Sequence, residues 1–320
     1  MFGLILVFFS SALTGWFVTI PVVWALRVFS MGQAIREEGP ASHKVKAGTP
    51  TMGGIGILLA ILIVILILIN VDLSIKYAAI IGLTFGYALL GFLDDTLKIR
   101  KKQNTGLLAS EKFLGQILFS AIFAAVLIFL GYADSAGGLL KALGLDNPYL
   151  YLPFVMLVIV GASNAVNLTD GLDGLAAGLL SIAFIAFGIV AFYMQCSDEA
   201  LISAIAGGAA LSFLRFNFKP AEIFMGDVGS LGLGALLAAI AVLLHKEFLL
   251  MLIGGVFVLE TLSVILQVAS YKLFEVRLFR MTPLHHHFEL LGISEPVVVI
   301  IFYVVALIFA VLGIRFYEFF

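Results

Sequence analysis

Cysteine and charge are the two scarcest features of this sequence, and each scarcity excludes a class of protein. Cys196 is the single cysteine, so the chain can form neither an intramolecular disulfide nor a cysteine-based zinc site. Only 12% of the residues are charged and the formal net charge is −2, which gives no electrostatic signal for nucleic-acid binding. Hydrophobic residues fill 62% of the 320 positions, whereas a soluble globular protein is about half apolar. These values exclude a soluble enzyme, a disordered chain and a secreted disulfide-rich domain, and they predict an integral membrane protein.

The apolar runs lack the alternation of a membrane β-strand and therefore predict helices. Residues 57–69 are apolar at every position up to Asn70. A membrane strand alternates over about ten positions, whereas a spanning helix needs about 20 mostly apolar residues. We therefore predict an all-α, polytopic helical bundle that forms one membrane domain over residues 1–320. The run from Phe2 to Leu26 is too long for a signal-peptide core and lacks a convincing cleavage site, so we interpret it as a retained span.

About ten apolar stretches are long enough to cross a bilayer. The predicted spans are residues 2–26, 53–70, 75–93, 113–131, 149–165, 175–195, 200–215, 229–245, 248–271 and 296–316. All Lys and Arg residues fall on one side of this arrangement except Lys76, Lys141, Lys246 and Arg315. The positive-inside rule makes the basic side cytoplasmic and places both termini outside.

Polar residues gather in the loops on the predicted cytoplasmic side. These loops are residues 30–52, 94–112, 163–174, 216–228 and 272–295. Glu260 is the main ionisable residue inside a predicted span, and it suits either a functional role or hydrogen bonding between helices. A channel or transporter more often has polar groups near the middle of the bilayer. The distribution therefore favours chemistry at the cytoplasmic interface.

Two adjacent carboxylates, Asp94 and Asp95, directly follow the apolar run 86–93. Carboxylates at the end of a span are costly unless they are solvated, paired with cations or bound to a metal. One interpretation is two solvated groups beside the basic run 98–102. The other is a general base, or a metal and phosphate environment, at the water boundary.

The segment from Asn167 to Gly174 is the second polar cluster. Asp170 and Asp173 are three residues apart, so a helical turn would place both carboxylates on one face. Gly171 and Gly174 allow tight turns or the close approach of a ligand to the backbone. The alternative interpretation is a plain polar loop between two spans.

Asp227 belongs to a third cluster, residues 216–230, and it lies between glycines at the start of the next predicted span. Carboxylates with water and phosphate oxygens are the usual environment of Mg²⁺. Alternatively, Asp227 only caps the N-terminus of that span.

Three consecutive histidines, His285, His286 and His287, form a fourth cluster. Consecutive side chains on a helix point about 100° apart, so the three cannot easily bind one zinc ion. Hydrogen bonding or charge donation to phosphate suits them better, and a purely structural role is the alternative. The mixed composition of residues 272–291 predicts an interfacial amphipathic helix.

The segment 43–54 places lysines beside a Gly- and Thr-rich turn. Ammonium and backbone N–H groups in such a turn can bind phosphate, but the order of a P-loop is absent. A solvated basic loop explains this segment equally well.

Taken together, polar loops rich in Asp, Lys, His and Gly indicate a Mg²⁺-dependent phosphate reaction, and the apolar walls indicate a lipid substrate.

These motifs together resemble the polyprenyl-phosphate N-acetylhexosamine-1-phosphate transferase superfamily. The aspartate pair, the 167–174 segment and the Asp227 loop mark the superfamily, whereas residues 48–54 and the triple histidine resemble its muramoyl-pentapeptide branch. The resemblance covers nearly the whole chain. Thr105 departs from the pattern, which often has a basic residue at that position, so we assign no phosphate contact there.

The resemblance implies a reaction in which UDP-N-acetylmuramoyl-pentapeptide and undecaprenyl phosphate give lipid I and UMP. It also implies Mg²⁺ as cofactor, a bacterial cytoplasmic (inner) membrane location with the site on the cytoplasmic face, and a homodimer. The nearest alternative is a sibling enzyme that transfers N-acetylglucosamine-1-phosphate to the same lipid. An alternative from another class is a phosphate or nucleotide-sugar transporter.

Carried over residue by residue, the resemblance assigns roles to the motifs. Asp227 would bind Mg²⁺, and Asp94 or Asp95 would serve the lipid phosphate, with Asp94 as the group that deprotonates it. Lys98 and Lys112 are candidates for phosphate contact. The uridine and diphosphate pocket would be lined by Lys46, Thr51, Asn167, Asp170, Asp173 and Phe224, with His285, His286 and His287 in the same cleft and Asn217 nearby.

Overall fold

The computed structural model describes residues 1–28, 48–68, 75–101, 103, 105–133, 141–145 and 147–320, and the described residues form helices and no strand. The helices are α1 (Phe2–Val28), α2 (Gly54–Leu68), α3 (Ile75–Lys101), α4 (Ala109–Phe129), α6 (Pro148–Thr169), α7 (Leu175–Tyr193), α8 (Ser197–Asn217), α9 (Gly226–Leu243), α10 (Glu247–Ile253), α11 (Gly255–Phe274), α12 (Leu284–Leu290) and α13 (Glu295–Phe316), with a short 3₁₀ turn, η2 (Tyr317–Phe319), at the end. This confirms the predicted all-α class.

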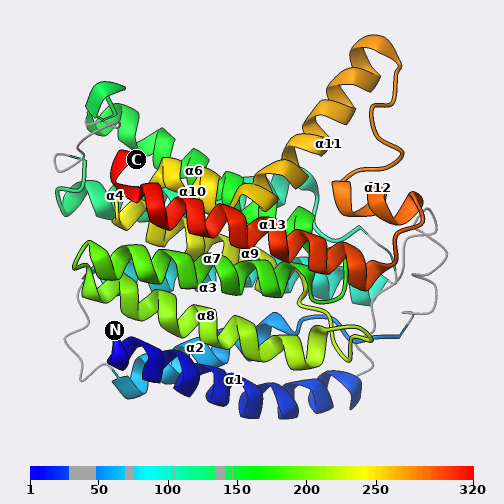
Figure 1. The fold of residues 1–320 in the computed structure, drawn as a ribbon, viewed down its shortest axis with the longest axis horizontal. Coiled ribbons are helices and arrows are strands. Elements are labelled where there is room, and N and C mark those ends of the chain that lie inside the picture. Colours follow the sequence, from blue (N-terminus) through cyan, green and yellow to red (C-terminus); the bar gives the residue numbers. More distant parts are fainter. Residues whose placement is uncertain (29–47, 69–74, 102, 104, 134–140, 146) are drawn as a thin grey trace.

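The long helices run side by side as a membrane bundle (Figure 1). Among the described residues, 9 helices are long and apolar enough to cross a membrane, and α2 is a shorter apolar helix. Each predicted span overlaps one of these helices, except that both α10 and α11 overlap the span 248–271. Both termini lie at one end of the bundle and α12 lies at the other, as expected for an even number of crossings (Figure 1).

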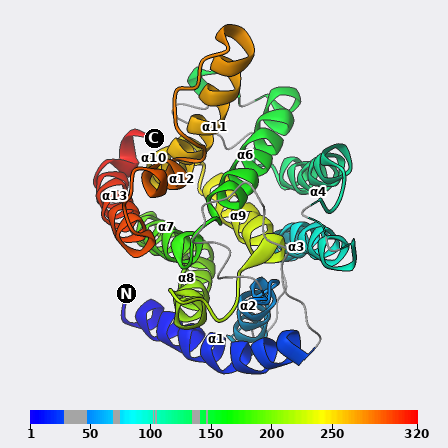
Figure 2. The same ribbon diagram turned by 90° about the vertical axis from the view of Figure 1, so that its right-hand side faces the viewer.

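Helix α9 lies at the centre of the bundle, between α3, α6, α7 and α8 (Figure 2). Glycines allow this close packing: a Cβ on Gly234 would lie 2.7 Å from the Ser163 Cα of α6. A Cβ on Gly232 would lie 3.2 Å from the Thr84 carbonyl oxygen of α3. The Ser163 hydroxyl donates to the Leu231 carbonyl at 3.1 Å. Because lipid is as apolar as these side chains, packing and hydrogen bonds hold the helices together.

Two helix boundaries differ from the sequence predictions. The loop that we expected to begin at Asp94 is helical as far as Lys101, because Lys98 pairs with Asp94 one turn earlier and basic residues stabilise a helix C-terminus. The span predicted over 248–271 is divided at Gly254. The Gly254–Gly255 pair has low helix propensity, and beyond it α11 leaves the bundle at an angle (Figures 1 and 2).

The prediction of one interfacial amphipathic helix over 272–291 is wrong. Helix α11 stops before Glu275, which adopts a left-handed φ of 57°, and only the short α12 follows. The side chain of Gln267 accepts hydrogen bonds from the backbone N–H groups of Leu278 and Phe279 at 2.9 Å each. This side chain folds the segment back along α11, which a local pattern of polar and apolar residues does not encode.

Candidate active site

Three carboxylates from two helices meet at the α12 end of the bundle. Asp94 and Asp95 lie near the C-terminus of α3, and Asp227 lies in the first turn of α9. One ligand oxygen from each lies within 4.8 Å of the others, a spacing at which the three could hold a metal ion. The structure therefore brings together the two acidic motifs that the sequence separates by more than 100 residues.

Two lysines neutralise part of this carboxylate cluster. The Lys98 Nζ lies 2.5 Å from Asp94 Oδ2 and 3.1 Å from Asp227 Oδ2. The Lys112 Nζ lies 2.6 Å from Asp227 Oδ2. Buried carboxylates need such partners because desolvation of an unpaired charge is costly. With all groups ionised, three carboxylates and two ammonium groups leave one negative charge in excess.

Backbone and amide donors orient each carboxylate. Asp94 Oδ1 accepts the Leu107 N–H at 2.9 Å, and Asp95 Oδ2 accepts the Val228 N–H at 3.4 Å. The side chain of Asp227 is 13% exposed, against 4% and 2% for Asp94 and Asp95. Asp227 is therefore the carboxylate of the three that a ligand reaches most easily.

The Asn167–Gly174 segment closes one side of the site. The Asn167 Nδ2 donates to Asp227 Oδ1 and to Ser230 Oγ, both at 2.9 Å, and so fixes α6 against α9. Helix α6 ends at Thr169, and Asp170 is its C-cap. Burial, which removes water from the Asp170 carboxyl group, and the nearby negative charge of Asp227 raise the pKa of Asp170 to about 7.

The prediction that one helical turn places Asp170 and Asp173 on a common face is wrong, because α6 ends before both. The Asp173 carboxylate accepts the Ala221 N–H at 3.1 Å. The Asn217 side chain accepts the Gly174 N–H at 3.1 Å and donates to the Ile223 carbonyl at 2.9 Å. Asp173 and Asn217 therefore hold the 167–174 and 216–228 segments together, and their contact with substrate stays a prediction.

The Gly- and Thr-rich turn packs on the loop before α9. The Phe224 N–H donates to the Pro50 carbonyl, and the Phe224 carbonyl accepts the Gly53 N–H, both at 2.8 Å. The Thr51 side chain is buried beside Gly226, whose Cβ would lie 2.7 Å from Thr51 Oγ1. Thr51 and Phe224 are thus next to the carboxylate cluster, whereas Lys46 lies outside the described residues.

The three histidines of α12 have different surroundings. His285 is buried against Gly171, where a Cβ would lie 2.2 Å from His285 Nε2. The His286 Nδ1 lies 3.0 Å from Glu289 Oε2, and the His287 Nδ1 accepts the Arg280 N–H at 3.2 Å. His285 is therefore the histidine placed directly against the 167–174 segment.

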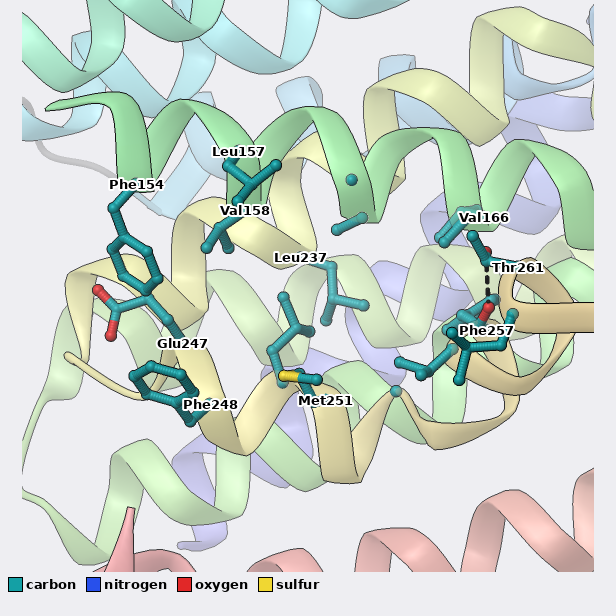
Figure 3. A pocket seen from close by; sticks show the side chains of 17 residues that line it. Phe154, Leu157, Val158, Val166, Leu237, Glu247, Phe248, Met251, Phe257 and Thr261 are labelled. Atoms are coloured by element: carbon teal, nitrogen blue, oxygen red, sulfur yellow. Dashed lines mark hydrogen bonds between the residues drawn. The ribbon is translucent and has the colours of Figure 1, made fainter. Parts of the chain in front are cut away.

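An apolar groove of about 400 Å³ lies between α6, α9, α10 and α11 (Figure 3). Glu247 and Phe248 line one end, and Val166 and Thr261 line the other (Figure 3). The Thr261 hydroxyl donates to the Phe257 carbonyl of its own helix at 2.9 Å, so it adds little polarity to the wall. Because Val166 directly precedes Asn167, the groove ends beside the helix turn that contacts Asp227.

Gly91 sets the distance between α3 and α9. A Cβ at this position would lie 2.1 Å from the Asp227 carbonyl oxygen, which is backbone and cannot rotate away. We expect Gly91→Ala to lower stability by about 1–3 kcal/mol or more through overpacking. Thermal unfolding in detergent micelles measures this loss as a lower midpoint. Gly82→Ala on the same helix is the matched control, since no atom lies within 4 Å of that Cβ; equal midpoints for both variants would contradict the prediction.

Sequence reasoning missed several positions that hold the site. Ser230 accepts from Asn167, and the buried Glu295 accepts the Asp173 N–H at 2.9 Å and pairs with Lys219 at 2.6 Å. The Leu107 N–H holds Asp94, although the 105–107 segment has no ionisable residue. Of these positions, only Glu295 could have been noticed in the sequence, because it is a charged residue at the start of an apolar span. A serine or a backbone N–H gives no such signal.

Sequence comparisons relate the chain to known proteins. The sequence profile of glycosyl transferase family 4 matches residues 77–245, which include the carboxylate cluster and the 167–174 segment. Relatives named phospho-N-acetylmuramoyl-pentapeptide-transferase are 49% identical over 294 residues in Shouchella clausii, 50% identical over 292 residues in Halalkalibacterium halodurans and 48% identical over 291 residues in Bacillus subtilis. Each alignment covers 90% of this chain and 90% of the relative.

Proposed function

Because this chain belongs to the phospho-N-acetylmuramoyl-pentapeptide-transferase members of glycosyl transferase family 4, we propose that it makes lipid I in peptidoglycan synthesis. An oxygen of undecaprenyl phosphate bonds to the sugar-bearing phosphorus of UDP-N-acetylmuramoyl-pentapeptide. The bond from that phosphorus to UMP breaks, and UMP leaves. The observation that carries the proposal is the identity of about half of all aligned positions over 90% of the chain.

We propose Mg²⁺ as the cofactor, because the donor set of the carboxylate cluster suits it. Mg²⁺ prefers hard oxygen ligands, and the three carboxylates of Asp94, Asp95 and Asp227 supply them within 4.8 Å of one another. Asp227, as the most accessible of the three, would be the ligand. When bound, Mg²⁺ would offset the negative charge of the diphosphate.

The side chains around the cluster would manage charge and protons. Lys98 and Lys112 would lower the repulsion between the anionic lipid phosphate and the anionic diphosphate. Asp94 would accept the proton of the lipid phosphate, and the Leu107 N–H would keep its carboxylate in place.

Two buried polar atoms support a nucleotide pocket beside the cluster. Within the described part of the chain, Thr51 Oγ1 and His285 Nε2 are buried without a hydrogen-bond partner. Buried polar atoms are nearly always hydrogen-bonded, so both atoms are free to pair with a substrate group. Asn167, Asp170 and Phe224 would complete the proposed pocket.

The apolar groove supports the proposed position of the lipid chain. Its walls are almost entirely hydrocarbon, and it ends at Val166, one residue before Asn167. A polyprenyl chain in this groove would place its phosphate near the carboxylate cluster, so the lipid would stay in the membrane and the nucleotide in water.

This protein is a multi-pass membrane protein. We propose that it lies in the bacterial inner membrane with the site facing the cytoplasm, and the homodimer stays a prediction.

The proposal is tested by UMP release from purified protein supplied with undecaprenyl phosphate and Mg²⁺. We expect release with UDP-N-acetylmuramoyl-pentapeptide and none with UDP-N-acetylglucosamine, and EDTA should abolish it. Release with the second donor alone would move the protein to the sibling reaction. If neither donor released UMP and the donor crossed the membrane of sealed vesicles, the result would instead support a transporter.

A further inference from the structure

Glu260 is a fully buried carboxylic acid in the second turn of α11, at 0% exposure. An ionisable group inside a membrane helix is expensive unless it has a partner, so its contacts indicate why it is there. Its Oε1 accepts the backbone N–H of His285 at 3.2 Å. The same oxygen lies 3.2 Å from the Nδ1 of the His285 ring.

The opposite side of the His285 ring points to the active site. His285 is also 0% exposed, and its Nε2 lies where a Cβ of Gly171 would be. Gly171 follows Asp170, beside the carboxylate cluster. The ring is therefore fixed between a carboxylate on α11 and the loop that closes the site, with its Nε2 unpaired among the described residues.

A carboxylate at one ring nitrogen determines what the other nitrogen can do. A proton on Nδ1 that faced Glu260 would leave Nε2 as an acceptor for a ligand. In the present conformation Nδ1 lies at ion-pair distance from Oε1 without a hydrogen bond, and the hydrogen bond that joins the two residues runs from the His285 backbone N–H to Oε1. The α11–α12 turn gives this contact further support, since Gln267 ties the returning segment to α11.

We propose that Glu260 is a positioning residue for the transferase reaction and acts only through His285, by holding its backbone N–H and the Nδ1 side of its ring in place. This inference rests on the proposed function and adds to it a residue that does not touch substrate. Through the contact between Glu260 and His285, α11, which projects from the bundle, is linked to the active site (Figure 1).

A double-mutant cycle measures this dependence. We expect Glu260→Gln to lower kcat/KM for UMP release by about 10–100-fold, the usual effect of removing a group that orients an active-site ligand. Glu260→Asp, which keeps the carboxyl group, should recover part of the loss. In a His285→Ala background, Glu260→Gln should change the remaining rate by less than about twofold, because the partner is already gone.

Ser263→Ala is the matched control, since the Ser263 hydroxyl donates to the Glu260 backbone carbonyl at 2.6 Å in the same turn. Its rate should stay within about twofold of the parent. An equal loss from Glu260→Gln in both backgrounds would overturn the inference, as would a Glu260→Gln rate that matches the parent. If Glu260→Gln fails to fold, Glu260→Asp completes the cycle. Activity of the parent protein tests the proposed function separately, so failure of one is distinguishable from failure of the other.

Discussion

Asp227→Ala should reduce UMP release by at least about 1,000-fold, which corresponds to about 4 kcal/mol of lost transition-state stabilisation. The reason is position: Asp227 is the most accessible of the three clustered carboxylates, and both Lys98 and Lys112 converge on its Oδ2. Removing it takes away the proposed Mg²⁺ ligand, and metal ions supply several kcal/mol in phosphoryl transfer. The initial rate of UMP release over a Mg²⁺ titration measures the effect.

Loss of Asp227 also leaves two lysines without their shared partner, so folding must be measured separately. Asp227→Asn keeps the shape of the side chain and an oxygen for the Asn167 amide, so its thermal unfolding midpoint should fall less than that of Asp227→Ala. Asp198→Asn is the matched control: this aspartate pairs with Lys76 at 3.6 Å at the other end of the bundle. Substantial Mg²⁺-dependent UMP release by folded Asp227→Ala protein would contradict the assignment of Asp227 as the Mg²⁺ ligand.

Asp94→Asn should lower turnover by about 100–1,000-fold while nucleotide binding is retained, which is the range for loss of a general base. An asparagine fills the same space and can still accept the Leu107 N–H, but it cannot take a proton from the lipid phosphate. Turnover is measured as UMP release at saturating donor, and binding as displacement of a labelled UDP-sugar.

Comparison with Asp95→Asn separates the two adjacent carboxylates. Asp95 is buried under the first turn of α9, where its Oδ2 accepts the Val228 N–H, so its loss should reduce stability as well as rate. Unchanged turnover in Asp94→Asn, combined with a large loss in a folded Asp95→Asn protein, would transfer the role of base to Asp95.

The sequence pointed to residues that the structure brings together, but not to their geometry. The aspartate pair, the 167–174 segment and the Asp227 loop were each found as local polar clusters; the three aspartates meet, and Asn167 donates to Asp227. The grouping of Asp170 with Asp173 failed, because a helix end after Thr169 sends the two side chains to different partners. Glu260 was visible as an exception in its span, but its partner 25 residues later was not.

The sequence by itself determined the class of the protein, the spans and the residue types of the site. Transfer of a segment into lipid depends on the summed hydrophobicity of its own residues, so membrane helices can be recognised one at a time. Only the tertiary structure decided which charges meet: that Lys112 of α4 reaches Asp227 of α9, and that His285 lies between Glu260 and Gly171. Those contacts depend on how closely the helices pack, which is set by glycines and side-chain volumes on several helices at once and not by any local pattern.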